Sequence, residues 1–271
     1  LFNQAYPEFQ GLSHIDLTAE CPFPLSYKSL ALDSLRFDLM GRDGTTYLRD
    51  MAIGYAGGQA RAEADIITAG DGPAQTRFQL ALTGADQEQA IRQLTALKNP
   101  GQERTTNDTP TGEGRLDLEL HALGSVDEPL QLSGYGSFQI ENDALHSIQL
   151  FGPLSRLLQN IRLGFTSFAL NQMEGDFTLA ESTVRFEPLE VNGPRSRIEA
   201  LGTLGLVDSA LTMRVSVYLF GNAGNPKSNI RKISDFISKP IPNILEFELT
   251  GTPEDQQWRS LYDPRKFIPQ F

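Results

Sequence analysis

Apolar and polar residues alternate along much of this chain, and the alternation limits its fold more than any other feature. It is clearest in two rows, Leu130, Leu132, Gly134, Gly136, Phe138 and Ile140, and Leu211, Met213, Val215, Val217 and Leu219. A period of two places every second side chain on the same face of a sheet. We therefore expect a mainly β protein with antiparallel strands that each have one apolar side, and its function depends on what covers that side.

A polar segment divides the chain. Residues 99–114 (NPGQERTTNDTPTGEG) contain no apolar residue beyond prolines and glycines, which is typical of an exposed linker or loop. We predict a β-rich region with one helix over residues 1–98 and a second β domain over residues 115–271. Ser34–Phe37 (SLRF) echoes Thr183–Phe186 (TVRF), which indicates a partial internal repeat, although chance explains the echo equally well.

About three short amphipathic helices are expected, because three segments replace the period of two with a helical period. They are residues 86–97, which begin with Asp86 as N-cap, residues 154–161 and residues 228–238. The third segment is net basic, and we predict that it contacts anionic lipid headgroups through Ile230, Arg231, Lys232, Ile233, Phe236 and Ile237. Packing of this helix on a sheet edge fits its pattern at least as well.

Composition excludes some classes of function. The net charge of −11 argues against nucleic-acid binding, which needs a basic surface that releases counterions. Cys21 is the only cysteine, so no internal disulfide can form, which fits the cytoplasm or a periplasmic protein without disulfides. No run approaches the roughly 20 apolar residues of a membrane-spanning helix. Because the chain begins with Leu1 rather than Met, we expect a piece of a longer protein or a processed product.

No pattern predicts catalysis or metal binding, so we expect no enzyme, no catalytic residue and no cofactor. The three histidines lie far apart in the sequence, at His14, His121 and His146. One cysteine and three histidines give no zinc-site spacing. Gly134-Tyr135-Gly136 lacks the third glycine of a dinucleotide motif and lies inside an expected strand, so it indicates a bend or a close backbone approach. The nearest carboxylate pairs lie in proline-containing, turn-like segments, at Glu187/Glu190 and Glu254/Asp255.

The second region resembles the C-terminal region of the AsmA-like proteins, the bacterial members of the bridge-like lipid transfer group. Residues 134–158 (GYGSFQIENDALHSIQLFGPLSRLL) carry the resemblance: a G-x-G, a strand, a tight turn, a leucine-rich strand and a short helix. Shorter matches follow in the same order, at residues 165–168, 177–179, 198–204 and 247–253. The resemblance covers residues 115–253 well and residues 1–98 loosely. Asp143 stands where the family usually has glycine, and Asn142-Asp143 can still form the turn.

The resemblance implies a long, curved antiparallel sheet that forms an open groove or partial barrel. It also implies a periplasmic protein, anchored to the inner membrane through an N-terminal segment absent from this chain. The implied function is to bind phospholipid or another acyl lipid and to support its transport to, or the maintenance of, the outer membrane, with inner- or outer-membrane proteins as further partners. We predict that the groove is lined by Leu132, Phe138, Ile140, Ile148, Phe177, Val215 and Val217.

A second interpretation fits the apolar rows equally well. In it, the strands close into a β-sandwich, the helices pack on the core, and the chain is a non-catalytic structural or interaction module that assists outer-membrane assembly. Alternation tells which residues share a face but not whether that face is open. A hydrolase would be a third interpretation, and no motif supports it.

Overall fold

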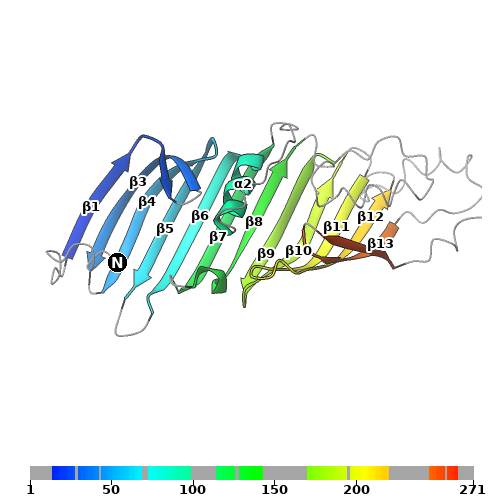
Figure 1. Ribbon diagram of the computed structural model, residues 1–271. Coiled ribbons are helices and arrows are strands. Elements are labelled where there is room, and N and C mark those ends of the chain that lie inside the picture. Colours follow the sequence, from blue (N-terminus) through cyan, green and yellow to red (C-terminus); the bar gives the residue numbers. More distant parts are fainter. Residues whose placement is uncertain are drawn as a thin grey trace, which may run out of the picture. The chain divides into compact units, whose positions relative to one another are not determined.

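Antiparallel strands make up most of the structure (Figure 1). The computed structural model describes residues 14–27, 30–42, 44–68, 73–98, 114–125, 128–142, 170–193, 196–219, 244–253 and 255–261. The strands are β1 (His14–Cys21), β2 (Leu25–Tyr27), β3 (Leu30–Arg42), β4 (Thr45–Tyr55), β5 (Gly58–Ile67), β6 (Gln75–Asp86), β7 (Arg115–Ser125), β8 (Ser133–Glu141), β9 (Gln172–Ala180), β10 (Thr183–Asn192), β11 (Ser196–Gly205), β12 (Leu211–Leu219), β13 (Ile244–Gly251) and β14 (Gln256–Ser260).

Hydrogen bonds join these strands into one open, antiparallel, 14-stranded sheet. Neighbours follow the chain in the order β1-β3-β4-β5-β6-β7-β8-β9-β10-β11-β12-β13-β14, and β2 pairs with β3. Tight turns make this order possible. Ala56 and Gly57 both have positive φ between β4 and β5, as do Glu181 and Ser182 between β9 and β10, which matches the right-handed twist of the strands they join. The predicted mainly β fold with an open antiparallel sheet is confirmed, and the closed β-sandwich of the second interpretation is wrong, because the sheet is not closed.

The expected number of helices is not confirmed. The described residues contain one α-helix, α2 (Gln87–Lys98), and one 3₁₀ turn, η2 (Pro129–Gln131), rather than about three amphipathic helices. The helix predicted at residues 86–97 is confirmed, and the Asp86 side chain caps it by accepting a hydrogen bond from the Gln89 N–H at 2.7 Å. The helices predicted at residues 154–161 and 228–238 lie outside the described residues.

Contacts divide the chain into two units. Unit 1 contains residues 1–105 and 116–136, and unit 2 contains residues 106–115 and 137–271, so the division falls within β8. Most of the predicted linker, residues 99–113, lies outside the described residues, and the boundary predicted there stays a prediction.

In unit 1, apolar side chains form rows across the strands on one face, which we call the apolar face of unit 1. Leu17, Leu39, Leu48, Ala64 and Phe78 pair in register from β1 to β6. A second row consists of Leu35, Ile53, Ala60 and Leu82. The opposite face, the polar face of unit 1, has charged and amide side chains at the intervening positions.

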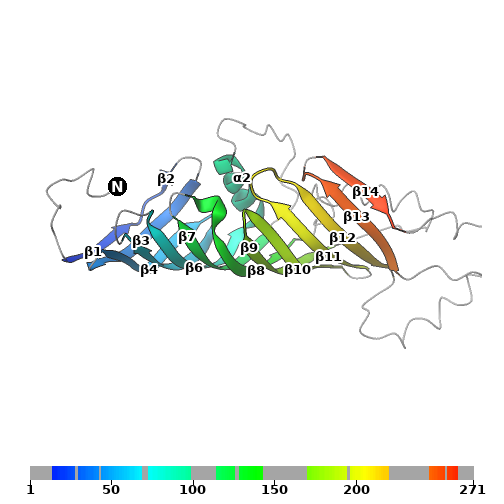
Figure 2. The same ribbon diagram turned by 90° about the horizontal axis from the view of Figure 1, so that it is seen from below.

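Helix α2 covers one end of the apolar face of unit 1 (Figure 2). The Tyr55 hydroxyl donates a hydrogen bond to the Ala90 carbonyl at 3.1 Å, and the Ala31 N–H donates one to Gln93 Oε1 at 2.9 Å. Tyr55 and Leu82 are buried there, together with Ala90 on the helix. Burial also raises the pKa of the Tyr55 hydroxyl, because it disfavours the charged phenolate.

Unit 2 has its own apolar face. Met173, Val191, Ile198 and Val217 pair in register from β9 to β12. Two further pairs lie on the same face, Val215 opposite Phe247 and Met213 opposite Leu249. All of these side chains are buried, and the largest of the fully buried ones is Phe247, which is 1% exposed.

Candidate functional site

Most of the side chains predicted to line a groove lie on strands β8, β9 and β12. Phe138 on β8 and Phe177 on β9 are brought together, with ring centroids 6.4 Å apart. The ring of Phe186 on β10 also lies 6.4 Å from that of Phe138. Ile140 follows Phe138 with the same parity on β8 and is buried. The structure therefore brings two of the predicted lining residues together, and whether they contact lipid stays a prediction.

Two of the predicted lining residues are deeply buried. Val215 is 2% exposed and Val217 is not exposed at all, and their cross-strand partners Ile198 and Phe247 are each 1% exposed. An acyl chain could reach these side chains only by displacing the atoms that now cover them. This end of unit 2 has the burial of a packed core rather than of an open surface.

The other two predicted lining residues lie elsewhere. Leu132 precedes β8 in unit 1, is half-buried and packs its side chain against Gly124. Ile148 lies outside the described residues. The basic segment predicted to contact lipid headgroups, from Ile230 to Ile237, also lies outside them, so its role stays a prediction.

The apolar face of unit 1 is a candidate site that the prediction from sequence did not include. Beyond the end covered by α2, the row of Leu39, Leu48, Ala64 and Phe78 is half-buried, and Leu17 at its β1 end is 45% exposed. Four strand spacings of roughly 4.8 Å separate β1 from β6, so the row extends about 19 Å across the sheet. The alternation at residues 34–39 and 78–82 was the signal that could have identified it.

A β-bulge keeps this face continuous. The pairing of β4 with β5 shifts between Leu48 and Met51, and Asp50 has a φ of 48°. Leu48 and Met51 are three residues apart, so a regular strand would point them to opposite faces. The extra residue of the bulge brings both to the same face, where Leu48 pairs with Ala64 and Met51 pairs with Ala62. Without the bulge, Asp50, Ala52 and Gly54 would take the positions on the apolar face that Met51, Ile53 and Tyr55 now hold.

The polar face of unit 1 carries paired charged and amide side chains. Arg49 forms an ion pair with Asp65 and also donates a hydrogen bond to the Ala64 carbonyl at 3.0 Å. The Gln79 amide donates a hydrogen bond to Glu63 at 3.3 Å. Within the described part of the chain, no group of three or more His, Cys, Asp or Glu residues is placed to hold a metal ion.

The polar face of unit 2 carries a denser charge cluster. Glu190 and Glu199 lie directly opposite each other on β10 and β11, and the Arg197 guanidinium bridges them, at 2.8 Å from Glu190. Tyr218 donates a hydrogen bond to Glu199 at 2.8 Å. This hydrogen bond, with smaller contributions from burial and from the Glu199 charge, raises the pKa of the Tyr218 hydroxyl. The cluster thus joins side chains from β10, β11 and β12 in one network.

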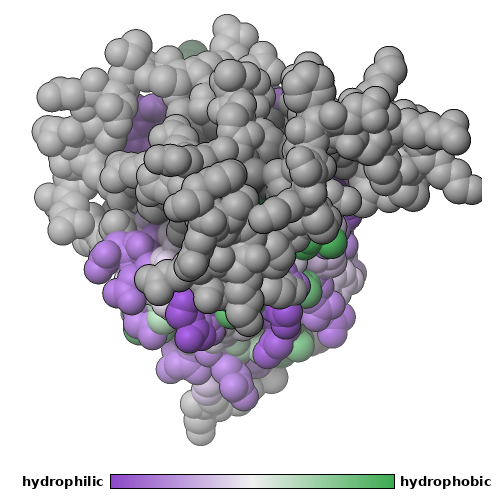
Figure 3. Space-filling view, turned by 90° about the vertical axis from the view of Figure 1, so that its right-hand side faces the viewer, coloured by the Kyte–Doolittle hydropathy of each residue, from purple (hydrophilic) through white to green (hydrophobic). Residues whose placement is uncertain are grey.

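The described surface visible in Figure 3 is mostly hydrophilic, with smaller hydrophobic patches among the charged residues. No helix among the described residues has the length and apolar character needed to cross a bilayer.

The chain matches no protein-family model, no curated protein and no solved structure.

Proposed function

We propose that this chain is a lipid-binding module that holds acyl chains against the apolar face of unit 1. One observation carries the proposal: beyond α2, this face presents rows of apolar side chains that are in register but only half-buried. Monomeric proteins rarely leave contiguous apolar surface uncovered, and such surface usually marks a binding site.

The energetics suit a carrier. Each CH₂ group of an acyl chain gains about 0.8 kcal/mol when it is fully buried, as in a bilayer, and gains part of this when it lies against Leu48 and Phe78. The chain is therefore bound no more tightly by such a face than by a bilayer. A carrier needs this balance, because a lipid bound much more tightly than in the membrane would not be released.

The resemblance to the AsmA-like proteins supports the wider setting of the proposal. In this setting, the module works in the periplasm, is anchored to the inner membrane by a segment outside this chain, and supports phospholipid transport to the outer membrane or its maintenance. Inner- or outer-membrane proteins would be its partners. The open strand order, with β1 and β14 at its two ends, is compatible with this role.

A second function is favoured by the burial in unit 2. Val191, Ile198, Val217 and Phe247 are all at most 1% exposed. This favours a packed, non-catalytic structural or interaction module in that part of the chain. The two roles are compatible if unit 2 supplies stability and unit 1 supplies the lipid surface.

Lipid extraction and mass spectrometry of the full chain, purified without detergent, test the proposal. We expect acyl lipid in stoichiometric amounts, and a several-fold loss when Leu48→Gln and Leu80→Gln are combined, because both add polar atoms to the apolar face. Ala81→Gln is the matched control, since Ala81 is exposed and pairs with Arg61 on the polar face. Absence of lipid, or equal lipid in the double variant and the control, would refute the proposal.

A further inference from the structure

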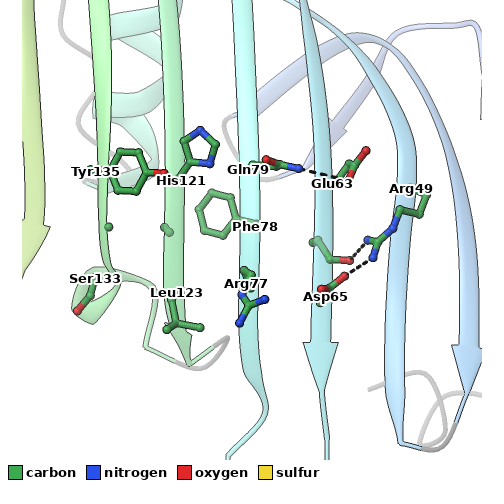
Figure 4. A pocket seen from close by; sticks show the side chains of 13 residues that line it. Arg49, Glu63, Asp65, Arg77, Phe78, Gln79, His121, Leu123, Ser133 and Tyr135 are labelled. Carbon is green, nitrogen blue, oxygen red and sulfur yellow. Dashed lines mark hydrogen bonds and ion pairs between the residues drawn. The ribbon is translucent and has the colours of Figure 1, made fainter.

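The polar face of unit 1 contains a shallow depression that the proposed lipid function does not use. It has a volume of about 340 Å³ and lies over strands β4 to β8, between Arg49 at one end and Tyr135 at the other (Figure 4). A second depression of about 510 Å³ shares Glu63, Gln79 and His121 with it. Five strands at roughly 4.8 Å spacing give the surface a length of about 19 Å.

An exposed aromatic ring stands at one end of this surface. Tyr135 is 61% exposed, and Leu123, two residues along β7 from His121, is 51% exposed, although both lie on the polar face (Figure 4). The Tyr135 ring is stacked on His121, with centroids 4.9 Å apart and planes within 16° (Figure 4). The stack fixes the orientation of a ring whose outer side remains open to a ligand.

The Gly134-Tyr135-Gly136 segment explains how the ring is presented. A Cβ atom on Gly134 would lie 2.1 Å from the His121 carbonyl oxygen and 2.9 Å from the Ala122 Cα, so only glycine allows β8 to approach β7 this closely. The close backbone approach predicted from the sequence is therefore confirmed. The approach brings Tyr135 over His121.

Planar polar groups line the rest of the surface. Arg49 is held by Asp65, and Gln79 is held by Glu63, while the exposed Arg77 lies opposite Asp65 in register (Figure 4). Guanidinium, carboxylate and amide groups can each make paired hydrogen bonds with neighbouring hydroxyl groups, and together they both donate and accept. The two arginines and two carboxylates cancel in charge, so the surface does not select an anion or a cation.

We propose that this surface binds a neutral oligosaccharide. The C–H groups on one face of a sugar ring would stack on the open side of Tyr135, where the π-electrons attract their partial positive charge. The hydroxyl groups of the following sugar units would bond to Arg77, Gln79 and Glu63. His121 is a positioning residue that holds the Tyr135 ring, and Leu123 extends the apolar contact.

Binding of cellohexaose and chitohexaose to the full chain, measured by calorimetry and saturation-transfer NMR, tests the proposal. We expect at least one of these neutral hexasaccharides to bind with up to millimolar dissociation constants. Tyr135→Ala should weaken that binding about fivefold, in line with the contribution of one aromatic contact, while Tyr135→Phe keeps the ring and stays within about twofold. Leu201→Ala, which removes an exposed apolar side chain in unit 2, should leave binding unchanged.

The proposal is overturned if neither hexasaccharide binds at millimolar concentration, or if Tyr135→Ala binds as well as the unchanged chain. Thermal unfolding of each variant verifies that the fold is retained, which we expect because Tyr135 is exposed. The lipid recovered from the Tyr135→Ala variant should equal that of the unchanged chain, because Tyr135 lies on the opposite face from Leu48. Failure of the oligosaccharide proposal and failure of the lipid proposal are therefore distinguishable.

Discussion

Gly202 on β11 is the position where one added methyl group should disturb unit 2 most clearly. Gly202 lies opposite Met213 on β12. A Cβ atom there would lie 2.1 Å from the Thr212 carbonyl oxygen and 2.6 Å from the Met213 Cα. Both neighbours are backbone atoms, so no side-chain rotation can relieve the contact, and β12 would have to move away by about 1 Å to restore ordinary van der Waals distances.

The cost of Gly202→Ala follows from this movement. Separating the strands weakens about two ladder hydrogen bonds, each worth about 1 kcal/mol, and disturbs the packing of the buried Met213, which costs about 1–2 kcal/mol more. Alanine also restricts the unfolded chain, which offsets about 0.4–1 kcal/mol of the loss. We therefore expect the free energy of unfolding of unit 2 to fall by about 2–3 kcal/mol.

Urea unfolding followed by tryptophan fluorescence measures this change. Trp258 is the only tryptophan, lies on β14 and packs edge-on against Phe247 at 6.2 Å, so it reports on unit 2. Gly175→Ala is the matched control, because its Cβ would lie 3.3 Å or more from its nearest neighbours, which include the adaptable side chains of Leu189 and Phe138. If Gly202→Ala unfolds at the same urea concentration as the control, the close strand approach is wrong.

Three further changes in unit 2 have expected outcomes. Phe247→Ala should lower the free energy of unfolding by about 3–5 kcal/mol, because it empties a fully buried site, and a loss below about 1 kcal/mol would contradict its core position. Arg197→Met should lower the free energy of unfolding in urea by about 1–2 kcal/mol, because Glu190 and Glu199 then face each other without a bridging cation. Adding Glu190→Gln should restore much of this loss, and a double variant without such rescue would show that the repulsion is unimportant. The raised pKa of Tyr218 contributes stability that is complete below the ordinary tyrosine pKa of about 10 and is lost as pH rises through the folded-state pKa. Glu199→Gln should therefore let Tyr218 ionise at a lower pH than in the unchanged chain. Absorbance titration measures this, and Tyr218→Phe identifies the part of the signal that belongs to Tyr218. An unchanged titration would contradict the hydrogen bond as the main cause.

Local patterns predicted much of the fold because their causes are local. The period of two in β12 follows from the pleat of a single strand, so Met213, Val215 and Val217 were assigned to one face without knowledge of their neighbours. The N-cap at Asp86 and the close approach at Gly134 also depend on the conformational preferences of single residues.

The site could not be predicted as well, because exposure depends on what lies across the sheet and above it. Val215 and Leu80 each stand between apolar residues at the second positions before and after them, yet Val215 is buried and Leu80 is half-buried. The bulge at Asp50 breaks the parity of β4, so simple alternation would assign Met51 to the wrong face. The stacking of Tyr135 on His121 joins two strands whose register no local pattern determines.

Site-specific photocrosslinking at Leu48 and Tyr47 tests most directly whether the apolar face of unit 1 takes acyl chains. The two residues are adjacent on β4 and point to opposite faces of the sheet, so each controls for the other. Benzoylphenylalanine at position 48, in the full chain expressed in cells, should form adducts with acyl lipid that mass spectrometry detects, while the same group at position 47 should not. Equal lipid adducts at both positions, or none at position 48, would contradict the account.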